Sequence, residues 1–447
     1  MSAILQSPKE WPQVLLARAG AKDPADLDEA LKAGAFDALR RAVRELGPEG
    51  TIAEVEASGL RGRGGAGHST AAKWRAAAET PARERYVVAN GYGADPAAST
   101  DRILLETDPY AVVEGVAIAA FAIGAEQGYI SIRATASEAI RRVEAAIIAA
   151  GERNYIGDDA LGSGRRIEIE VRPVQGAYML GEETVLLKAL DGKRGQPEQR
   201  PPHPATRGFR NAPTVVLNIQ TLASVPWILR NGAAKFAAIG AGDAPGTILV
   251  DIRGSEQSGV AEVPLGTPLD QVVALGGNPA KGRSLKAVVV GGPTGGILPP
   301  SQLRTSYSYA ALREVGAHIG SGSVIVADDR TCIVDLARLL TRFSADEACG
   351  KTIPCRIGVR RLAEIGERLT MGTSRAGDEQ LLEDLAADIV GSALCDHERL
   401  ATLPMMSGLR YFKEELDAHY ARGECPAGVC RPIGLGAGMP VAAGAGA

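Results

Sequence analysis

The segment Gly59–Trp74 reads GLRGRGGAGHSTAAKW and places five glycines within nine residues, ahead of a Ser-Thr pair and an alanine-rich run. Glycines permit positive φ and close approach of a ligand, and the free N–H groups of a helix's first turn attract anions. The segment therefore predicts a loop that leads into a helix and binds a phosphate, a diphosphate or a dinucleotide. A flexible, solvated basic loop is the alternative. The pattern is not GxxxxGK[ST], because Lys73 follows the helix start, and no alternating strand precedes it as in a dinucleotide fingerprint.

Length, charge and cysteine content exclude several classes of protein. The 447 residues suffice for two to four domains. The net charge of −4 gives no basis for a nucleic-acid partner. The first residues, MSAILQSPKEWPQ, lack a basic stretch followed by an apolar one, so we expect no secretory signal. Six cysteines in a chain of this length favour cytoplasmic thiols or metal ligands over a disulfide scaffold.

Apolar spacing predicts an α/β domain in the first half of the chain. The expected helices cover residues 27–57, 110–126 and 137–149 and, after a turn from Arg207, an apolar stretch that ends at Leu229; the expected strands cover residues 86–90, 129–133 and 166–172. The most apolar window, residues 112–125, is too short to span a bilayer and carries Glu114. We therefore expect a buried helix there and no membrane insertion.

The second half changes from short β runs to helices. Strands are expected at residues 247–252, 261–264, 284–290 and 321–328, with a small helix at 269–275. From Thr331 to Ala421 the pattern is almost wholly helical, which predicts a small bundle.

A second charged motif opens a short helix at Val185–Leu190. Gly181–Thr184 reads GEET, and two adjacent acids at a helix start favour the helix dipole, so a purely structural role is the alternative for this motif alone. The glycine-rich loop and the longer stretch GEETVLLKALDGKRGQPEQRPPHPA resemble, in this order, two signatures of the flavin-binding, NADH-oxidising subunit of respiratory complex I. Diaphorase subunits of NAD-linked hydrogenases and formate dehydrogenases share these signatures.

The resemblance runs from about residue 27 to residue 430 and implies the domain organisation. It implies an FMN-binding, Rossmann-like α/β domain with an N-terminal helical segment over residues 1–246. A ubiquitin-like β-grasp domain would follow over residues 247–330, and a helical bundle of the iron–sulfur type over residues 331–423. Residues 424–447 would form a truncated, cysteine-containing tail rich in glycine and alanine.

The resemblance also implies which residues bind the cofactors. The FMN site would be lined by Gly62, Arg63, Gly64, Gly65, Ala66, Gly67, Lys73, Asn90, Tyr178, Glu182, Glu183, Asn218 and Thr221, and the NAD(H) nucleotide would be contacted by His68, Asp95 and His203. Several positions depart from the family pattern: His68 and His203 replace aromatics, Tyr92 and Gly93 replace acids, Leu217 replaces an asparagine and Gln220 replaces a glutamate. A histidine ring can still stack on a nucleotide. For Asn90 alone, an Asx turn is the alternative.

The cysteines resemble the family's iron–sulfur loop, with one ligand missing. Cys349–Arg356, CGKTIPCR, resembles CGxCxPCR, and Cys395 follows Cys355 by 40 residues, but Thr352 stands at the second ligand position. Four thiolates normally hold a [4Fe–4S] cluster. Three alternatives stay open: a cubane on Cys349, Cys355 and Cys395 with an open or oxygen-ligated iron, a [3Fe–4S] cluster, or an empty remnant.

The other three cysteines have less definite roles. Cys332 is expected to be a core thiol in the middle of a helix. Cys425 and Cys430, in CPAGVC, are predicted to supply the missing cluster ligand, to form a redox pair, or to have no role.

The resemblance implies an NADH dehydrogenase subunit that transfers hydride from NADH to FMN and passes electrons to iron–sulfur partners. The flavin would do the chemistry, so no catalytic acid or base is expected. The implied partners are a thioredoxin-like [2Fe–2S] subunit and a larger iron–sulfur or molybdenum-type subunit. We expect a cytoplasmic protein that reaches a membrane only through its complex. The alternatives are a degenerate flavin-binding or scaffolding subunit that no longer uses NADH, and a flavoprotein with another electron donor.

Overall fold

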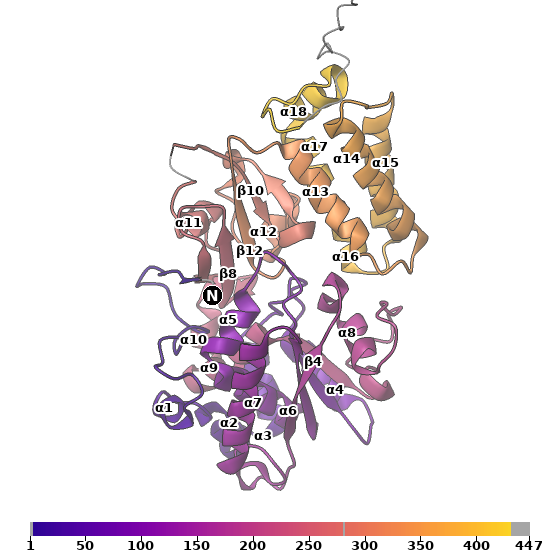
Figure 1. The fold of residues 1–447 in the computed structure, drawn as a ribbon. Helices are drawn as coiled ribbons and strands as arrows, with labels where there is room; N and C mark the ends of the chain where they lie inside the picture. Colours follow the sequence, from indigo (N-terminus) through magenta and orange to yellow (C-terminus); the bar gives the residue numbers. More distant parts are fainter. Residues whose placement is uncertain (1–2, 280–281, 431–447) are drawn as a thin grey trace, which may run out of the picture.

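The computed structural model describes residues 3–279 and 282–430, and the rest of the predicted tail, residues 431–447, lies outside that range. Three parts follow one another along the molecule in Figure 1: an α/β part in indigo to magenta, a second sheet in the middle, and a helical bundle in orange and yellow. Within the described ranges, no helix is both long and apolar enough to cross a membrane.

A four-stranded parallel sheet forms the centre of the first part. Its strands are β2 (Tyr86–Gly91), β3 (Gln127–Arg133), β4 (Glu168–Val174) and β5 (Thr214–Asn218), in the order β4-β3-β2-β5. The expected α/β architecture is confirmed. The interpretation of Arg207–Leu229 as a turn and one apolar helix was wrong, because β5 precedes α9 (Ile219–Asn231). The run of three apolar residues in β5, residues 215–217, is too short to show a periodicity of its own, and the β-branched side chains of Thr214, Val215 and Val216 favour the strand.

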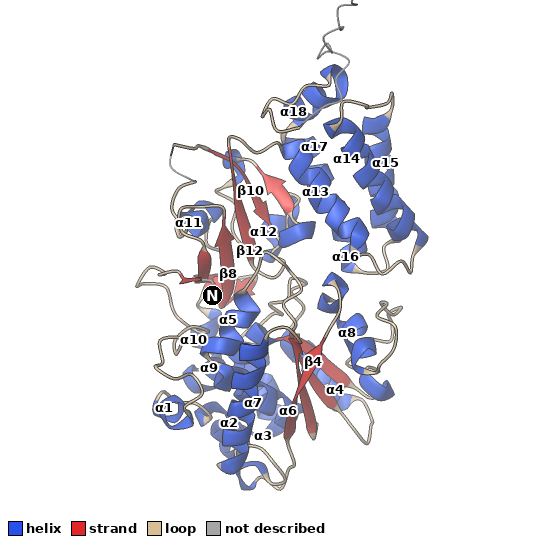
Figure 2. Ribbon diagram, in the orientation of Figure 1, coloured by secondary structure: helices blue, strands red, loops and turns tan. Residues whose placement is uncertain are grey.

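Helices cover both faces of this sheet (Figure 2). The expected buried apolar helix is present as α6 (Pro109–Ile123), in which every residue is buried. Oε1 of its buried Glu114 accepts the N–H groups of Ala38 at 3.0 Å and Leu39 at 3.1 Å, and Oε2 lies 3.7 Å from Nη1 of Arg230. The other helices of this part are α1 (Leu27–Lys32), α2 (Asp37–Arg41), η1 (Ala42–Leu46), α3 (Gly47–Ala57), α4 (Thr70–Glu79), α5 (Thr100–Thr107), α7 (Ser137–Glu152), η2 (Ala160–Gly162), η3 (Tyr178–Gly181), α8 (Glu183–Leu190), η4 (Phe209–Asn211) and α10 (Ala233–Ala237).

The second sheet has six strands in the order β1-β9-β8-β12-β10-β11. They are β1 (Ala3–Ile4), β8 (Thr247–Arg253), β9 (Gly259–Pro264), β10 (Leu285–Val290), β11 (Gly296–Leu298) and β12 (Ser323–Asp328); the short strands β6 (Gly240–Ala241) and β7 (Ala244–Pro245) pair separately, and α11 (Leu269–Ala274) and α12 (Tyr309–Glu314) accompany the sheet. The strands and the small helix expected in residues 247–328 are thus present.

The N-terminal segment joins this second sheet, although the predicted boundary at residue 246 assigned it to the first domain. Strand β1 pairs in parallel with β9. The buried Glu262 carboxylate accepts the N–H groups of Val14 at 2.7 Å, Leu15 at 2.9 Å and Leu16 at 2.9 Å. Sequence periodicity does not reveal such a long-range pairing, because a two-residue strand has no pattern to read.

The C-terminal part is the expected helical bundle. It contains α13 (Ile333–Asp346), η7 (Pro354–Val359), α14 (Arg360–Thr370), α15 (Asp378–Ser392), α16 (Asp396–Leu400), α17 (Leu403–Tyr411), α18 (Lys413–Asp417) and η8 (Ala418–Arg422). Cys332 does not lie in the middle of a helix as expected. It caps the start of α13, where its sulfur accepts the N–H of Asp335 at 3.4 Å, because the chain arrives there from a turn after β12.

Replacing Gly115 with alanine tests how closely α6 and α9 pack. A Cβ at Gly115 would lie 2.1 Å from the carbonyl oxygen of Leu222, so one helix backbone must move. We expect Gly115→Ala to lower the free energy of unfolding by about 2–3 kcal/mol, seen as a lower apparent Tm. Gly151→Ala is the matched control: nothing lies within 4 Å of its added Cβ, so a gain of up to about 1 kcal/mol is expected there. Equal Tm values for the two variants would contradict this close packing.

Candidate functional site

The carboxyl ends of β2 and β5 meet at the centre of the parallel sheet. Strand β3 pairs with one edge of β2, and β4 pairs with the far edge of β3. Strand β5 then pairs with the opposite edge of β2, so the strand order changes direction at β2. In the register of these two strands, Asn90 lies opposite Asn218. Ligands of open parallel sheets bind in the crevice at such a switch in strand order. The fold therefore brings two of the predicted flavin contacts to the expected edge.

The glycine-rich loop lies against this edge and leads into α4. The backbone N–H of Arg63 donates to Oγ1 of Thr221 at 2.8 Å, and a Cβ at Gly64 would lie 3.4 Å from the Cβ of Asn218. Ser69 caps α4 by accepting the N–H of Ala72 at 3.2 Å. The predicted sequence of loop and helix N-terminus is thus present.

Two glycines of the loop allow it to pack closely against the part of the molecule that contains the six-stranded sheet. Gly65 and Gly67 have positive φ, and an added Cβ would come within 3.1 Å of the Gly320 carbonyl oxygen and 2.7 Å of the Tyr309 ring, respectively. The Tyr309 hydroxyl donates to the carbonyl of Gly62 at 2.8 Å. The exposed residues of the predicted flavin-binding loop are Gly64 and Ala66, so a ligand can approach the backbone there.

The Arg63 side chain turns away from any ligand. It is fully buried, and its guanidinium donates to the carbonyls of Thr247 at 2.9 Å, Arg61 at 3.0 Å and Pro245. Arg63 therefore fixes the loop to the second sheet's part, and only its backbone belongs to the crevice.

Lys73, Glu183 and Arg200 form a charged cluster next to the loop. The ammonium of Lys73 donates to Oε2 of Glu183 at 2.5 Å, and Arg200 donates to Oε1 at 2.9 Å. Burial opposes ionisation of Glu183, but Lys73 and Arg200 outweigh it and hold the pKa of Glu183 below its usual value of 4.5. His68 is the neighbour of this cluster, and desolvation of its ring together with the positive charge of Lys73 lowers its pKa.

Glu182 caps α8 with one carboxylate oxygen and leaves the other without a hydrogen bond. Its Oε2 accepts the N–H groups of Thr184 and Val185, both at 2.9 Å. Its Oε1 is buried, has no hydrogen-bond partner among the residues that the structure describes, and lies 3.6 Å from Nη2 of Arg200. Burial raises the pKa of Glu182. An unpaired buried acceptor facing the charged cluster is what a donor group on a bound ligand would satisfy.

The side chains of Asn90 and Asn218 organise the two strand ends. Asn90 donates to the Leu180 carbonyl at 3.2 Å and accepts the N–H of Tyr92 at 3.1 Å, which is the Asx turn considered above. Asn218 donates to the buried Asp101 carboxylate at 2.9 Å, and Gln220 donates to it at 3.0 Å. These hydrogen bonds therefore hold the ends of β2 and β5 in place.

The predicted nucleotide-binding residues lie in different environments. Asp95 is 3% exposed, and its carboxylate accepts the Ser323 hydroxyl at 2.6 Å and the N–H of Ala97 at 2.8 Å. It thus ties the turn after β2 to β12. His203 is exposed, and its carbonyl accepts the N–H of Thr206 at 2.9 Å. His68 lies beside the charged cluster, where its ring interacts with Lys73 and Glu183.

Tyr178 lies where the three parts of the molecule meet. Its N–H donates to the Glu347 carboxylate at 2.7 Å, and its hydroxyl is 3.4 Å from that of Thr294. Its ring packs edge-on against Phe343 at 5.4 Å between centroids. Burial raises the pKa of the Tyr178 hydroxyl to about 12. These contacts fix the acidic motif both to the bundle and to the part of the molecule that contains the six-stranded sheet.

The three predicted cluster cysteines come together near the acidic motif. Cys349 and Cys395 pack in the apolar cluster that contains Leu180 and Val185, while Cys355 packs in the bundle core. Burial raises the pKa of Cys355 to about 12, with neighbouring Cys395 and Cys349 adding to it. In Figure 1, α16, whose N-cap is Cys395, faces α8 at the lower end of the bundle.

Thr352 points at a buried carboxylate. Its hydroxyl donates to Oε1 of Glu398 at 2.8 Å, and Oε2 of Glu398 accepts the N–H of Leu394 at 2.8 Å. Glu398 is 1% exposed. At the position that lacks a cysteine, the oxygen atoms available as metal ligands are therefore the Thr352 hydroxyl and the Glu398 carboxylate.

Two family models match the chain on either side of this junction. The Nuo51 FMN-binding domain matches residues 55–227, and the NADH-ubiquinone oxidoreductase-F iron–sulfur binding region matches residues 335–419. The F 2 subunit of the NADH-quinone oxidoreductase of Rhizobium meliloti (strain 1021) is 38% identical over 415 residues, which cover 92% of this chain and 99% of that protein. The chain belongs to the F-subunit family of NADH-quinone oxidoreductases.

Hydrogenase subunits are similar to this F-family chain over the same length. Subunit HndC of the NADP-reducing hydrogenase of Solidesulfovibrio fructosivorans is 38% identical over 433 residues, or 96% of this chain and 88% of that protein. A crystal structure of NAD+-reducing [NiFe]-hydrogenase in the H2-reduced state superimposes with a TM-score of 0.81 at 31% identity, covering 94% of this chain and 68% of that one. These relatives are subunits of larger oxidoreductases, which implies electron-transfer partners.

Membership of the F-subunit family confirms the resemblance, with an FMN-binding domain and an iron–sulfur binding region in this chain. Sequence reasoning missed two residues of the site. Arg200 lies in the recognised stretch, but its pairing with Glu183 depends on a loop conformation. Glu398 follows Cys395 by three residues, and that proximity to a ligand cysteine was the available signal.

Replacing Glu183 with glutamine in the FMN-free protein tests the charged cluster. Because the folded-state pKa of Glu183 lies below 4.5, its ionised form adds stability above about pH 4.5 that is lost as the pH falls further toward that lower pKa. We expect the loss of unfolding free energy in Glu183→Gln to shrink when the pH is lowered from about 6 to about 4. Denaturant titrations at each pH measure it.

Glu182→Gln is the matched control from the adjacent position. Burial raises the pKa of Glu182, so its effect changes with pH in the opposite direction. The same trend in both variants would contradict the assigned roles of Lys73 and Arg200.

Proposed function

We propose that this F-family subunit binds FMN at the carboxyl edge of the parallel sheet, oxidises NADH there and passes the electrons to iron–sulfur partners. The observation that carries the proposal is the convergence of the glycine loop, the charged cluster and the switch in strand order at which Asn90 faces Asn218. A bound FMN accepts two electrons as a hydride from NADH and releases them singly.

The residues of the crevice fit a phosphate-bearing flavin. Gly64 and Ala66 offer exposed backbone, and Lys73 brings a cation to the start of α4. Oε1 of Glu182 accepts no hydrogen bond within the described residues, so an N–H or O–H of the ligand would pair it. Pairing it removes a cost of about 1–3 kcal/mol.

Other predicted flavin contacts act by positioning in this proposal. Thr221 and Arg63 hold the loop, Asn90 holds the segment at Leu180, and Asn218 holds the end of β5. Tyr178 fixes the acidic motif against the bundle. Their effect on flavin binding is then indirect, through the shape of the crevice.

The nicotinamide nucleotide is proposed to lie on the side of His68. The lowered pKa keeps this ring neutral near pH 7, so it stacks without adding charge. His203 stays a prediction as the second stacking residue. Neither residue is needed as an acid or base, since hydride transfer requires proximity and orientation.

One observation favours the alternative of a flavin-binding or scaffolding subunit that does not use NADH. The Asp95 carboxylate is already engaged by Ser323 and Ala97, and acids are absent at Tyr92 and Gly93. Nucleotide recognition through acidic side chains would then be weak. The same observation also favours the alternative of a flavoprotein that uses another electron donor.

The proposed partners are a thioredoxin-like [2Fe–2S] subunit and a larger iron–sulfur or molybdenum-type subunit, in a cytoplasmic complex that is peripheral to any membrane. Ile353 and Ile357, on either side of Cys355, are 66% and 47% exposed. Exposed apolar side chains beside a cofactor site are typical of a surface that a partner covers.

Anaerobic titration of the FMN-loaded protein with NADH tests the proposal. We expect the flavin band near ~450 nm to bleach at about one NADH per FMN. FMN that binds but stays oxidised would favour the subunit that does not use NADH, and a protein that takes up no FMN would contradict the proposed site. Lys73→Met should weaken FMN binding about tenfold or more, whereas Lys193→Met, an exposed lysine paired with Asp191, should leave it unchanged.

The iron–sulfur site has one cysteine fewer than a cluster with four thiolates requires. Thr352 and Glu398 occupy the fourth position, so the cubane with three thiolates, the [3Fe–4S] cluster and the empty site remain the alternatives. We expect Thr352→Cys to raise the iron and sulfide bound after anaerobic reconstitution to about four of each per chain. Thr352→Ser is the control that keeps the hydroxyl, and an equal iron content in all three proteins would contradict the importance of the fourth thiolate.

A further inference from the structure

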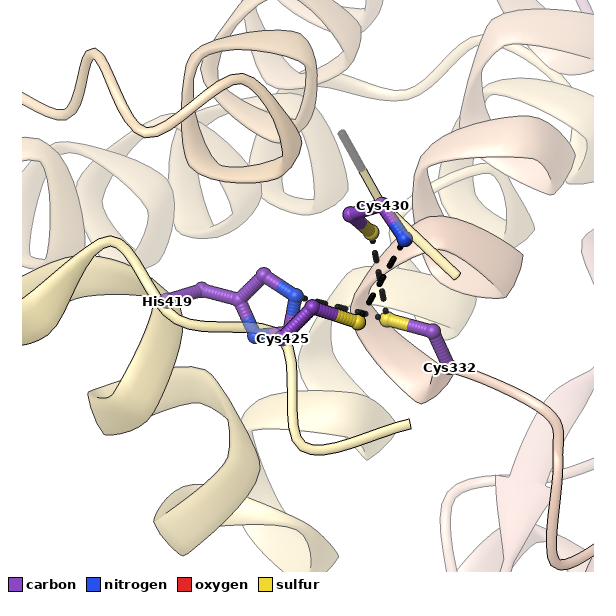
Figure 3. A group of neighbouring side chains, drawn as sticks. All are labelled: Cys332, His419, Cys425 and Cys430. Carbon is purple, nitrogen blue, oxygen red and sulfur yellow. Dashed lines mark hydrogen bonds between the residues drawn. The ribbon is translucent and has the colours of Figure 1, made fainter. Parts of the chain in front are cut away.

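Three cysteines and a histidine gather at the end of the bundle that lies far from the flavin crevice. They are Cys332 at the start of α13, His419 in η8, and Cys425 and Cys430 in the segment that follows (Figure 3). One ligand atom from each residue lies within 4.8 Å of all the others. Cys332 and His419 lie 93 and 6 residues before Cys425 in the chain, so no local spacing connects Cys332 with the CPAGVC segment.

The spacing of these atoms suits one tetrahedral ion. Sγ of Cys332 lies 3.4 Å from Nε2 of His419 and 3.5 Å from Sγ of Cys430. Zinc–sulfur bonds of about 2.3 Å and zinc–nitrogen bonds of about 2.0 Å place tetrahedral ligands about 3.5–3.8 Å apart. An iron–sulfur cluster spreads its ligands over several irons, which requires wider separations.

The histidine is held in the tautomer that a metal ligand needs. Nδ1 of His419 lies 2.8 Å from the carbonyl oxygen of Glu415, which only accepts hydrogen bonds, so Nδ1 carries the proton. Nε2 therefore keeps its lone pair and faces the sulfur of Cys332. Fixing a ligand histidine through its other nitrogen is typical of metal sites.

Two of the sulfurs accept backbone hydrogen bonds, which would stabilise thiolates there. Cys332 caps α13, a helix of 14 residues, so the positive end of the helix dipole lies at its sulfur. The N–H of Asp335 donates to Sγ of Cys332 and the N–H of Cys430 donates to Sγ of Cys425, both at 3.4 Å. Cys332 and His419 are buried, while Cys425 and Cys430 are partly exposed, which leaves a path for an ion to enter.

We propose that Cys332, His419, Cys425 and Cys430 bind one Zn²⁺ ion as a structural site. Four protein ligands fill a tetrahedral zinc ion and leave no open position for a substrate. On binding, the three thiols release three protons to solvent, and three thiolates with one Zn²⁺ leave a site charge of −1. No electron is transferred.

The site attaches the segment around residues 425–430 to the start of α13, across 98 residues of sequence. It is separate from the cysteines of the iron–sulfur region, which lie beyond the other end of α13, about 20 Å away along a helix of 14 residues (Figure 1). Cys425 and Cys430 therefore do not supply the fourth ligand that Thr352 lacks. The proposal does not depend on NADH oxidation.

Zinc analysis of the full-length protein tests this inference. We expect about one zinc per chain after expression with added zinc, and an intense thiolate-to-metal band when Co²⁺ replaces it. Cys430→Ser and His419→Gln should lower the apparent zinc affinity at least about a hundredfold in competition with a chromogenic chelator. Cys355→Ser, which removes a cysteine of the iron–sulfur region, is the matched control and should keep the zinc.

A count of reactive thiols provides a second measurement that does not depend on stable variants. In the FMN-free, iron-free wild type, zinc should protect three of the six cysteines from alkylation, and removing zinc with a chelator should expose Cys425 and Cys430 first. A wild type that binds no zinc, a site filled by iron and sulfide, or zinc lost in Cys355→Ser would each overturn the proposal.

Discussion

The flavin crevice depends on the way Arg63 is buried. Its backbone N–H is held by Thr221 on the first sheet's side, and its guanidinium is held by the carbonyls of Thr247 and Pro245 on the other side. Burying a guanidinium is unfavourable unless its donors are paired, and here three carbonyls pair them. The loop that contacts a ligand is thus fixed from two directions, while Gly64 and Ala66 stay open. A cofactor that binds there meets a preformed surface and loses little free energy in ordering it.

Much of the fold follows from local pattern. The buried helix α6 and strands β2, β3 and β10 lie where apolar spacing predicts them, because each is long enough to show its period. Strand β5 was missed because its apolar run, residues 215–217, is too short to show a period and is separated from the apolar helix α9 only by Asn218. The error matters, since β5 creates the switch in strand order. Only the pairing of β5 with β2 makes it a strand, and pairing is a property of the whole sheet.

The candidate site was predictable in its residue types and less so in its geometry. The glycine loop, Glu183 and Lys73 were recognised from sequence and lie together. The directions of side chains were not: Arg63 and Asp95 face other parts of the protein, and Arg200 arrives from a loop. The group of Cys332, His419, Cys425 and Cys430 spans 98 residues, and no local spacing rule links its ends. Such groupings become visible only when tertiary packing has placed the segments.

The pairing of β1 with β9 has a consequence for the order in which the protein folds during synthesis. The first strand leaves the ribosome early, but Ser7 and its partner Glu262 are 255 residues apart. The whole four-stranded sheet is therefore synthesised before the N-terminal segment can reach its place. Closing so long a loop costs little more than closing a shorter one, because the cost grows only with the logarithm of length. The N-terminal residues can thus complete the second sheet only after the flavin domain, which they precede in the chain, has been synthesised.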